Sequence, residues 1–292
     1  MAINSEWGVD EDGVPFRDGR LQLRDGRTLA WRIWGERHGR PVVRLQGTAS
    51  TRLARGPNPL SVGAQMIMVD RPGFGYSTRL PGRRLCQVAD DIIELLDFLG
   101  FDDVPVVAHS GGAPHALALG ACHRQRVRSI TVGSGACPIL PSERVSLIQA
   151  NADLGRALDL GWEGVHTYLT GIGSRLLSEG ISVVLADAPP EDRSRLDNVL
   201  FQRRDTQRRR EAFRQGFAGW TDETMAIAGP WDFDPRDVGV HVDWWHGVND
   251  VAVPLSAARR LTEQLSDCEL HVVEGRAHYL DVGALLSRSL AE

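Results

Sequence analysis

Short apolar segments alternate with longer amphipathic segments over the first half of this sequence, and this alternation limits the possible folds more than any other feature. Residues 83–99 carry apolar side chains at helical spacing, and Gly100 follows as a helix-ending glycine. Strands separated by such helices favour a mostly parallel, doubly wound α/β sheet. The apolar segments short enough for buried strands are Pro41–Leu45, Gln65–Val69, Val104–Ala108 and Val127–Val132.

The middle of the chain has a different pattern. Residues 139–218 show only helical periodicity and polar linkers, whereas strands and helices alternate again between Val240 and Leu290. A chain of 292 residues is long enough for one large core with an inserted subdomain. We therefore predict an α/β core made of residues 1–138 and 219–292, with a helical cap inserted at residues 139–218.

Composition excludes several classes of partner and cofactor. The formal net charge is -5, which gives no reason to expect nucleic acid or an acidic membrane as a partner. All 33 basic residues are arginine, so chemistry that needs a lysine, such as pyridoxal-phosphate anchoring or a Walker phosphate site, is excluded. The nine histidines do not have the spacing of metal ligands. We expect neither a cofactor nor a metal.

Three features bear on where the protein is found. The sequence has no run of about 18 apolar residues, so we expect no membrane-spanning helix. Residues 1–16 do not combine a basic segment with an apolar one, and so do not resemble a signal peptide. The four cysteines form no CxxC pair, which is typical of separate thiols in a cytoplasmic enzyme. These features predict a cytoplasmic location.

Ser110 lies where a buried strand ends and a helix begins, in the run Val-Pro-Val-Val-Ala-His-Ser-Gly-Gly-Ala-Pro. Small residues stand two positions before and after it, Ala108 and Gly112, as the strained turn of a nucleophile elbow requires. The usual pattern is G-x-S-x-G, and here alanine replaces the first glycine. The Gly111 N–H, at the start of the helix, can stabilise negative charge. The alternative is a serine that only caps the helix.

Asp250 and His278 each follow a later strand, and the chain order Ser, Asp, His is the one that accompanies a nucleophile elbow. His278 would take the proton of Ser110, and Asp250 would fix the tautomer of the imidazole. Each residue taken singly has an ordinary alternative, because a loop aspartate is a common turn former and a lone histidine is often structural. Asp243 is a rival acid, but it lies inside a predicted strand.

The loop Gln46-Gly47-Thr48 directly follows a buried strand and is expected to lie beside the strand that carries Ser110. The backbone N–H of Thr48 can then join that of Gly111 in an oxyanion hole. An ordinary strand-to-helix turn is the alternative. Residues 70–77 read Asp-Arg-Pro-Gly-Phe-Gly-Tyr-Ser, in which proline and two glycines enforce a fixed turn. We expect this turn to support the loops beneath the active site and to take no part in the chemistry.

The predicted cap is rich in aromatic residues. Trp162, Tyr168 and Phe213, together with Gln46 of the loop, are the candidates for lining a pocket that suits a bulky apolar substrate. The alternative is that these aromatic side chains form the interior of the cap. Residues 202–214 contain many arginines, which predicts a solvated helix face. A docking patch for a carrier protein or an acidic substrate is the other interpretation of that segment.

Four segments occur in a family-specific order: the D-R-P-G-F-G-Y-S turn, the H-S-G-G-A-P elbow, an H-G-x-x-D segment and a G-x-A-H segment. In this order the chain resembles the α/β-hydrolase superfamily, and within it the proline-iminopeptidase-like and general esterase branch. The resemblance implies an α/β-hydrolase fold with a helical cap and a triad of Ser110, Asp250 and His278. The sequence departs from the family at residues 46–49, where His-Gly followed by proline is common. The Gly-Gly-Pro-Gly of proline iminopeptidases is absent, so peptidase activity is not favoured.

We interpret the chain as a serine hydrolase that forms an acyl-enzyme on Ser110 from an ester, thioester or lactone of a small, bulky apolar metabolite. This small-molecule substrate is the expected partner, and association of identical chains is left open. One alternative is a cofactor-free lyase, cyclase or C–C bond hydrolase, in which His278 acts as general base on the substrate. Another is a ligand-binding protein that has lost turnover.

Overall fold

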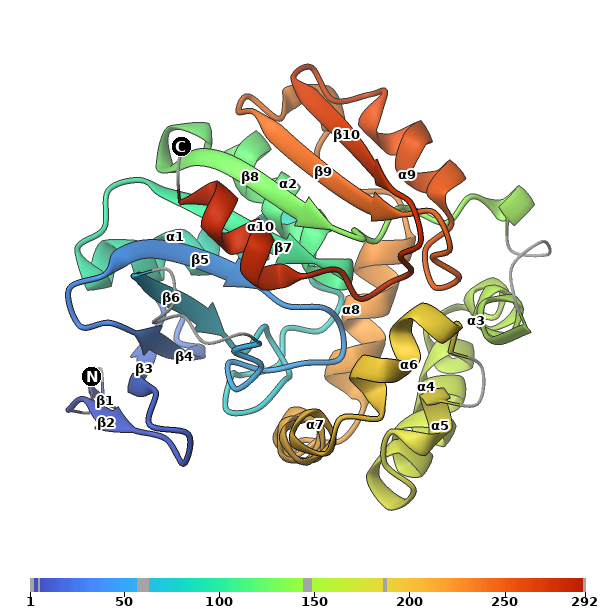
Figure 1. The fold of residues 1–292 in the computed structure, drawn as a ribbon, viewed down its shortest axis with the longest axis horizontal. Helices are drawn as coiled ribbons and strands as arrows, with labels where there is room; N and C mark the ends of the chain where they lie inside the picture. The colour runs from blue at the N-terminus through green and yellow to red at the C-terminus, as the bar shows by residue number, and fades with distance from the viewer. Residues whose placement is uncertain (1–2, 5, 57–62, 144–148, 186–187, 291–292) are drawn as a thin grey trace.

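One mixed sheet forms the centre of the molecule in a computed structural model, which describes residues 3–4, 6–56, 63–143, 149–185 and 188–290 (Figure 1). The strand order is β1-β3-β4-β6-β5-β7-β8-β9-β10, and β2 pairs with β3. Small parts of the predicted core and cap, residues 1–2, 5, 57–62, 144–148, 186–187 and 291–292, lie outside the described residues. The strands are β1 (Ile3–Asn4), β2 (Gly8–Val9), β3 (Pro15–Gln22), β4 (Thr28–Gly35), β5 (Arg40–Leu45), β6 (Ala64–Val69), β7 (Val104–His109), β8 (Val127–Gly133), β9 (Val242–Gly247) and β10 (Cys268–Val273).

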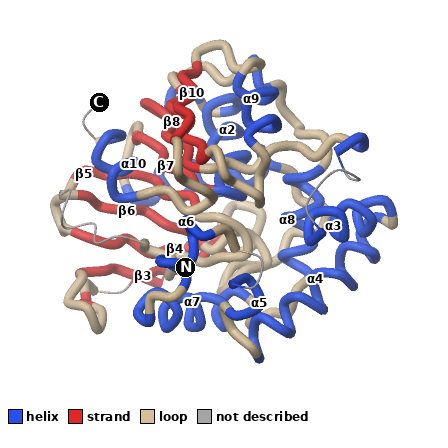
Figure 2. The backbone as a smooth tube through the Cα atoms, turned by 45° about the vertical axis from the view of Figure 1, so that its right-hand side comes forward, coloured by secondary structure: helices blue, strands red, loops and turns tan. Residues whose placement is uncertain are grey.

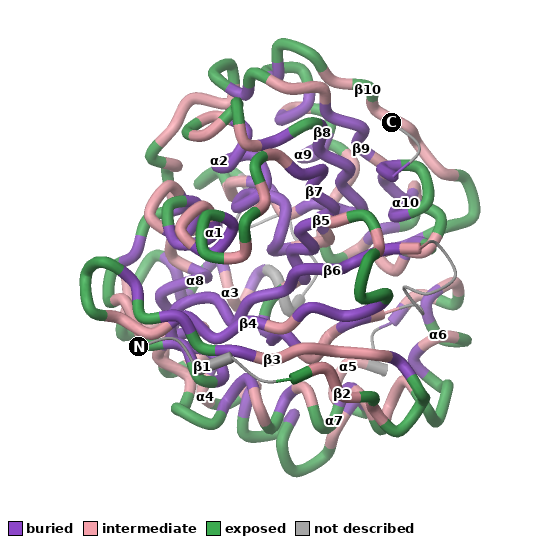
Figure 3. The backbone as a smooth tube through the Cα atoms, turned by 90° about the vertical axis from the view of Figure 1, so that its left-hand side faces the viewer, coloured by how far each residue is buried: buried purple, intermediate pink, exposed green. Residues whose placement is uncertain are grey.

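The larger part of the sheet is parallel. β3, β4 and β6 are antiparallel neighbours, whereas each pair from β6 through β5, β7, β8, β9 to β10 is parallel. The central strands are apolar on both faces, as parallel strands covered by helices must be. Figure 3 shows them buried, with exposed residues mainly in the surrounding loops and helices.

Helices cover both faces of this sheet. Successive side chains of a strand point to opposite faces, so neighbouring residues of one strand pack against different helices. Val106 packs in the cluster that contains α1 (Leu85–Leu99), α2 (Ala113–Cys122) and α9 (Leu255–Thr262). The next residue, Val107, packs with α10 (Val282–Ser289) (Figure 1). This arrangement confirms the predicted doubly wound α/β fold.

Helix α1 illustrates how closely the sequence pattern predicts the core elements. Its buried side chains include Val88, Ile92 and Leu95, one helical turn apart, and it ends at Gly100 with φ 77°. Glycine adopts that left-handed conformation without steric cost. One expectation about this region is wrong: Cys86 of α1 and Cys122 of α2 form a disulfide. The prediction of separate thiols failed because residues 36 apart in sequence gave no sign that the two helices lie side by side.

A series of helices fills the chain between β8 and β9 and gathers beside one end of the sheet (Figure 2). No helix among the described residues has both the length and the apolar character that a membrane span requires. The last helix of the series begins at the predicted boundary of the cap, and the division into core and cap stays a prediction. The helices are α3 (Gln149–Asp159), α4 (Gly161–Ser178), α5 (Ser182–Leu185), α6 (Pro190–Leu196), α7 (Val199–Ala212) and α8 (Ala218–Ala228).

Candidate active site

Ser110 lies at a sharp turn between β7 and α2, as the sequence predicts. It opens a short 3-10 turn, Ser110–Gly112, and has φ 50°, a left-handed conformation that is rare and costly for a residue with a side chain. The turn forms because small residues surround it. A Cβ atom at Gly112 would collide with the carbonyl oxygen of Leu45, so glycine is required there.

Asp250 and His278 are brought together from different loops. The Asp250 side chain is buried after β9, and its Oδ2 atom accepts a hydrogen bond from His278 Nδ1 at 2.9 Å. Its Oδ1 atom accepts the backbone N–H groups of Ala252 and Val253 at 2.9 Å each. Burial raises the pKa of Asp250, but the facing His278 and these hydrogen bonds outweigh it and hold the pKa below its ordinary value. The Asp250 carboxylate therefore accepts the hydrogen bond of His278 Nδ1, and the other ring nitrogen of His278, Nε2, is not bonded to Asp250.

The rival acid lies elsewhere. Asp243 is on β9, where its Oδ1 atom pairs with His271 Nε2 at 2.7 Å and its Oδ2 atom faces Arg288 at 3.4 Å. These contacts involve the β10 and α10 side of the sheet and not His278. The structure thus favours Asp250 over Asp243 as the partner of the imidazole.

His109, which precedes the nucleophile candidate, also contacts His278. Its Nε2 atom lies 3.1 Å from the carbonyl oxygen of His278, and the two rings meet edge to face with centroids 5.0 Å apart. Burial lowers the pKa of His109 to about 3, and the nearby His278 contributes to this shift. His109 is therefore neutral at physiological pH, and its Nε2–H donates to the carbonyl.

Helix α6 fixes the loop that carries His278. Asp192 is buried and accepts the backbone N–H groups of His278 at 3.1 Å and Tyr279 at 3.0 Å. Next to it, Glu191 accepts the side-chain amide of Asn249, which neighbours Asp250, at 2.5 Å. Sequence analysis missed both acids, because an acidic pair in the first turn of a polar helix looks like an ordinary helix start.

The oxyanion loop lies against the elbow. The Thr48 nitrogen would be 3.1 Å from a Cβ atom at Gly111, so the Thr48 amide is next to the start of the helix. In the described part of the chain, no backbone or side-chain acceptor takes the Thr48 N–H. An unpaired donor beside the Gly111 backbone is the arrangement that an oxyanion hole needs.

A buried cluster of charges holds this loop from below. Arg71 donates from Nη1 to the carbonyl oxygen of Gln46 at 2.7 Å and from Nη2 to that of Gly47 at 3.1 Å. Glu223 of α8 pairs with Arg71, and its other carboxylate oxygen accepts the Thr48 hydroxyl. The predicted role of the 70–77 turn as a support is thus confirmed, although the sequence gave no indication of Glu223.

An arginine and a histidine also surround the Glu223 carboxylate. Arg83 lies 3.0 Å and His115 3.3 Å from Glu223, and all three side chains are fully buried. Burial alone would raise the pKa of Glu223, but Arg71 and Arg83 hold it far below its ordinary value. Burial lowers the pKa of His115 to about 4, with Glu223 opposing the shift. The cluster therefore contains two guanidinium groups, one carboxylate and a neutral imidazole.

Comparison with known proteins agrees with this geometry. A profile of the α/β hydrolase fold family matches residues 46–172, which include the oxyanion loop and the elbow. A solved structure of a hydrolase from Pseudomonas aeruginosa PA01 has a TM-score of 0.69 and 18% sequence identity, and covers 94% of this chain and 98% of that chain. The chain belongs to the α/β-hydrolase superfamily. Its branch within the superfamily stays a prediction.

Two curated relatives of this α/β-hydrolase superfamily member differ in how much they share with it. The "2-hydroxymuconate semialdehyde hydrolase" of Pseudomonas putida is 23% identical over 259 residues, which are 84% of this chain and 82% of the relative. The "Uncharacterized hydrolase YcgS" of Bacillus subtilis (strain 168) is 30% identical over 112 residues. That match spans 38% of this chain and 39% of the relative, well under half of either protein.

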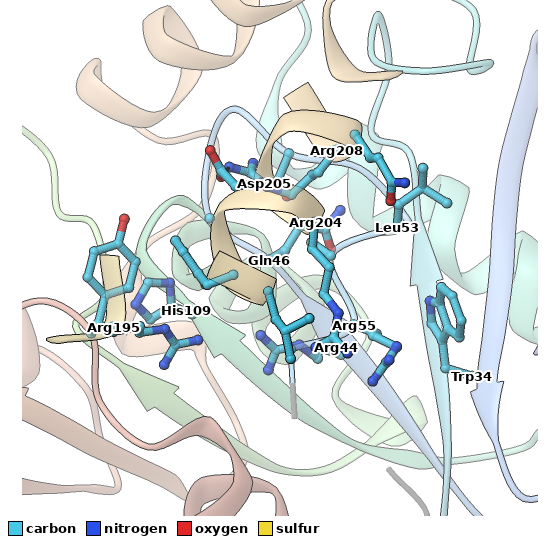
Figure 4. A pocket seen from close by; sticks show the side chains of 18 of the residues that line it. Trp34, Arg44, Gln46, Leu53, Arg55, His109, Arg195, Arg204, Asp205 and Arg208 are labelled. Atoms are coloured by element: carbon cyan, nitrogen blue, oxygen red, sulfur yellow. Dashed lines mark hydrogen bonds and ion pairs between the residues drawn. The ribbon is translucent and has the colours of Figure 1, made fainter. Parts of the chain in front are cut away.

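The α/β hydrolase has a cavity of about 1020 Å³ at the elbow (Figure 4). Ser110 and His278 both line it, together with Thr48, Gln46 and His109. Helix α7 and the end of α6 form the opposite part of the lining, and the arginines that contribute to the wall stand out in Figure 4. A small molecule in this cavity would contact the elbow, the loop and the helices between β8 and β9.

Three of the four predicted pocket residues do not line this cavity, so the prediction needs correction. Gln46 lines it, with Nε2 donating to the carbonyl oxygen of Val69 at 2.8 Å. Trp162 instead donates to Asp222 at 2.8 Å and stacks on His166. Tyr168 and Phe213 pack within apolar clusters of the helices. Helical periodicity predicted that these side chains are buried, but it did not show which residues they pack against. The aromatic residues that do line the cavity are Phe16, Trp34, Phe201 and Tyr279.

The arginine-rich segment 202–214 is a solvated face only in part. Arg203 and Arg210 of α7 are exposed, whereas Arg209 is buried and pairs with the buried Asp205. Arg204 and Arg208 line the cavity. The sequence pattern missed this because charge content alone does not show where one turn of a helix faces a cavity.

One group of potential metal ligands lies away from the elbow, among the residues that the structure describes. His241, Asp243 and Glu269, on or next to β9 and β10, each present one ligand atom, and these atoms lie within 4.8 Å of one another. Asp243 already pairs with His271 and Arg288. The cluster is not part of the cavity lining, so it has no connection with the chemistry at Ser110.

Proposed function

We propose that this chain is a serine hydrolase that cleaves an ester, thioester or lactone of a small molecule through an acyl-enzyme. The observation that carries the proposal is the left-handed Ser110, which shares a cavity with an imidazole held by Asp250 at 2.9 Å. His278 Nε2 would take the Ser110 proton as the hydroxyl attacks the carbonyl carbon, and would return it to the leaving group. Water would then release the acyl group by the same route.

The backbone around the elbow supports acyl transfer. The tetrahedral intermediate carries its negative charge on the former carbonyl oxygen, which needs two aligned donors. Thr48 N–H and Gly111 N–H are the candidates, since the Thr48 amide is unpaired in the described structure and adjoins Gly111. The loop lacks the histidine and proline common in this superfamily, and the Arg71 hydrogen bonds to its carbonyl groups supply rigidity in their place.

A fluorophosphonate probe tests the nucleophile directly, because its phosphorus centre mimics the tetrahedral intermediate. The wild-type protein should be labelled on Ser110, and short 4-nitrophenyl esters should show a burst. Ser110→Ala should remain unlabelled, and kcat of Ser110→Ala and His278→Ala should fall by roughly 10⁴-fold or more. Ser50→Ala is the matched control, since Ser50 also lines the cavity and should leave labelling intact. Labelling of another residue, or none in a folded protein, would sink the proposal.

A second function is favoured by one observation, the match over 84% of this chain to the "2-hydroxymuconate semialdehyde hydrolase". In a C–C bond hydrolase, His278 would act as general base on the substrate and Ser110 would hydrogen-bond to it. The probe would be 2-hydroxymuconate semialdehyde itself. Residual cleavage of that compound by Ser110→Ala, with ester turnover lost, would select this function. A protein that binds the compound without cleaving any substrate would be the non-catalytic binder.

A further inference from the structure

Arg44 is a buried cation with no counter-ion among the residues that the structure describes. It follows two valines of β5, its exposed fraction is 5%, and its Nε and Nη1 atoms have no hydrogen-bond partner among the described residues. Burial lowers the pKa of Arg44 to about 10, and the charge of Arg195 adds to that shift. Buried arginines are normally paired with a carboxylate. Arg44 lines the cavity, so its side chain is part of the wall around the space that would hold the substrate.

Arg195 faces the same cavity from α6. One of its nitrogens, Nη1, lies 3.4 Å from the carbonyl oxygen of Leu280, and its guanidinium lies over the rings of Phe201 and Tyr279. Burial lowers the pKa of Arg195, opposed by Tyr279, Asp281 and Asp192. Neither of those carboxylates forms an ion pair with Arg195 in the described structure.

The two nearby carboxylates are occupied by backbone groups. Asp192 accepts the N–H groups of His278 and Tyr279, and Asp281 caps α10 by accepting those of Gly283 and Ala284. Arg195 therefore retains donors for a ligand. In Figure 4, Arg195 lies beside His109, and Arg44 lies farther along the cavity next to Arg55.

The other arginines of the cavity wall differ from this pair, because each forms an ion pair with at least one carboxylate. Arg32 pairs with Asp18, Arg55 with Asp10 and Asp12, Arg204 with Asp12, and Arg208 with Asp205. Among the arginines that line the cavity, Arg44 and Arg195 are those without a carboxylate partner in the described structure. Both lie near His109, since both depress its pKa in addition to the larger effect of burial.

We propose that Arg44 and Arg195 bind a carboxylate of the substrate, so that the enzyme acts on esters, thioesters or lactones that carry a second, ionised carboxyl group. The guanidinium of Arg44 has no carboxylate partner among the described residues, and a carboxylate is the group that its planar set of donors binds well. Its position near His109, the residue before Ser110, places the anion in the cavity beside the reacting carbonyl. This specificity rests on the proposed hydrolysis at Ser110, whereas the anion site itself does not depend on turnover.

Two esters that differ in a single carboxylate test the specificity: 4-nitrophenyl hydrogen glutarate and its methyl ester. The wild-type kcat/KM should be at least roughly tenfold higher for the acid. Arg44→Met should reduce the acid-to-methyl-ester ratio by about tenfold, to near one, because methionine removes the charge that pairs with the carboxylate. Arg204→Met is the matched control, since Arg204 lines the same cavity but is ion-paired, and the ratio should stay near the wild-type value. A wild-type ratio of about one, or equal effects of the two substitutions, would overturn the proposal.

A binding experiment separates failure of the anion site from failure of the hydrolase proposal. In Ser110→Ala protein, glutarate should raise Tm, and the rise should vanish when Arg44→Met is added. An Arg44-dependent rise without turnover of any ester would uphold the anion site and reject hydrolysis. Turnover of both esters without any glutarate effect would reject the anion site and uphold hydrolysis. Arg195→Met should reproduce the loss of binding and replaces Arg44→Met if that variant does not fold.

Discussion

Asp192 accepts the backbone N–H of His278 at 3.1 Å, so a helix between β8 and β9 holds the loop of the proposed general base. The same residue is also held from the elbow, because His109 Nε2 lies 3.1 Å from the carbonyl oxygen of His278. The helices of this segment therefore do more than cover the cavity. Through Asp192 they determine where the imidazole stands relative to Ser110.

Asp192→Ala should therefore lower kcat by about tenfold or more with little change in KM, because a base displaced by a fraction of an ångström loses its alignment with the nucleophile. The measurement is steady-state hydrolysis of a short 4-nitrophenyl ester. Asp197→Ala removes an exposed acid at the end of the same helix and serves as the control. Equal kinetics for the two variants would show that the hydrogen bonds of Asp192 are not needed for positioning.

Glu223→Gln should reduce the free energy of unfolding by about 3 kcal/mol or more, because it leaves Arg71 and Arg83 buried without their counter-ion. Denaturant unfolding at pH 7 provides the measurement. The same variant should be labelled more slowly by the fluorophosphonate, since Arg71 and Glu223 both contact the oxyanion loop. A variant as stable as the wild type would contradict the role assigned to the buried cluster.

The stability of the fold should decrease as pH falls below about 6.5. Burial lowers the pKa of His109 from 6.5 to about 3 and that of His115 from 6.5 to about 4 in the folded protein. Below pH 6.5 and above these folded pKa values, the unfolded chain therefore binds more protons than the folded protein. Stability from these groups is complete above pH 6.5 and is lost on acidification. Asp70 and Asp91 act in the opposite direction, because burial raises their pKa values, to about 6 for Asp70. Burial also lowers the pKa of His246, so three histidines oppose these two carboxyl groups.

The measurement is the free energy of unfolding at several pH values between 4 and 7. His115→Gln should reduce the slope by up to about 1.4 kcal/mol per pH unit, the contribution of one titrating group. His38→Gln, at an exposed position, should leave the slope unchanged. A slope equal in wild type and His115→Gln would mean that the imidazole does not remain neutral in the folded protein.

The sequence predicted those parts of the site that follow from local pattern. Ser110 directly follows β7, and Asp250 and His278 lie in the loops after β9 and β10. Because parallel strands end at the same edge of a sheet, it could be foreseen that Ser110 and His278 line one cavity. The support from Asp192 and Glu223 could not be foreseen, because each is an ordinary acid on a helix whose packing is decided by the tertiary structure. Trp162 and Phe213 were misplaced for the same reason.

Arg44 can be noticed in the sequence. It interrupts an otherwise apolar strand, Pro41-Val42-Val43-Arg44-Leu45, where a charge is costly unless it has a partner or a function. Sequence alone does not show whether that partner exists. The structure answers this for the described residues, since it leaves Nε and Nη1 unpaired.

Because the buried charge of Arg44 destabilises the folded protein, Arg44→Met should raise the free energy of unfolding by about 1–3 kcal/mol at pH 7, while it weakens carboxylate binding. Burial lowers the pKa of Arg44 from 12.5 to about 10, so the charged form destabilises the folded state at every pH below 10, and the penalty is relieved as pH rises through that value. The unbranched methionine fills most of the space of the arginine stem without the charge. Chemical unfolding of both proteins at pH 7, with Arg204→Met as the ion-paired comparison, measures the difference. A loss of stability in Arg44→Met would mean that the guanidinium has a stabilising partner in the folded protein, and would remove the reason to regard it as held ready for a substrate anion.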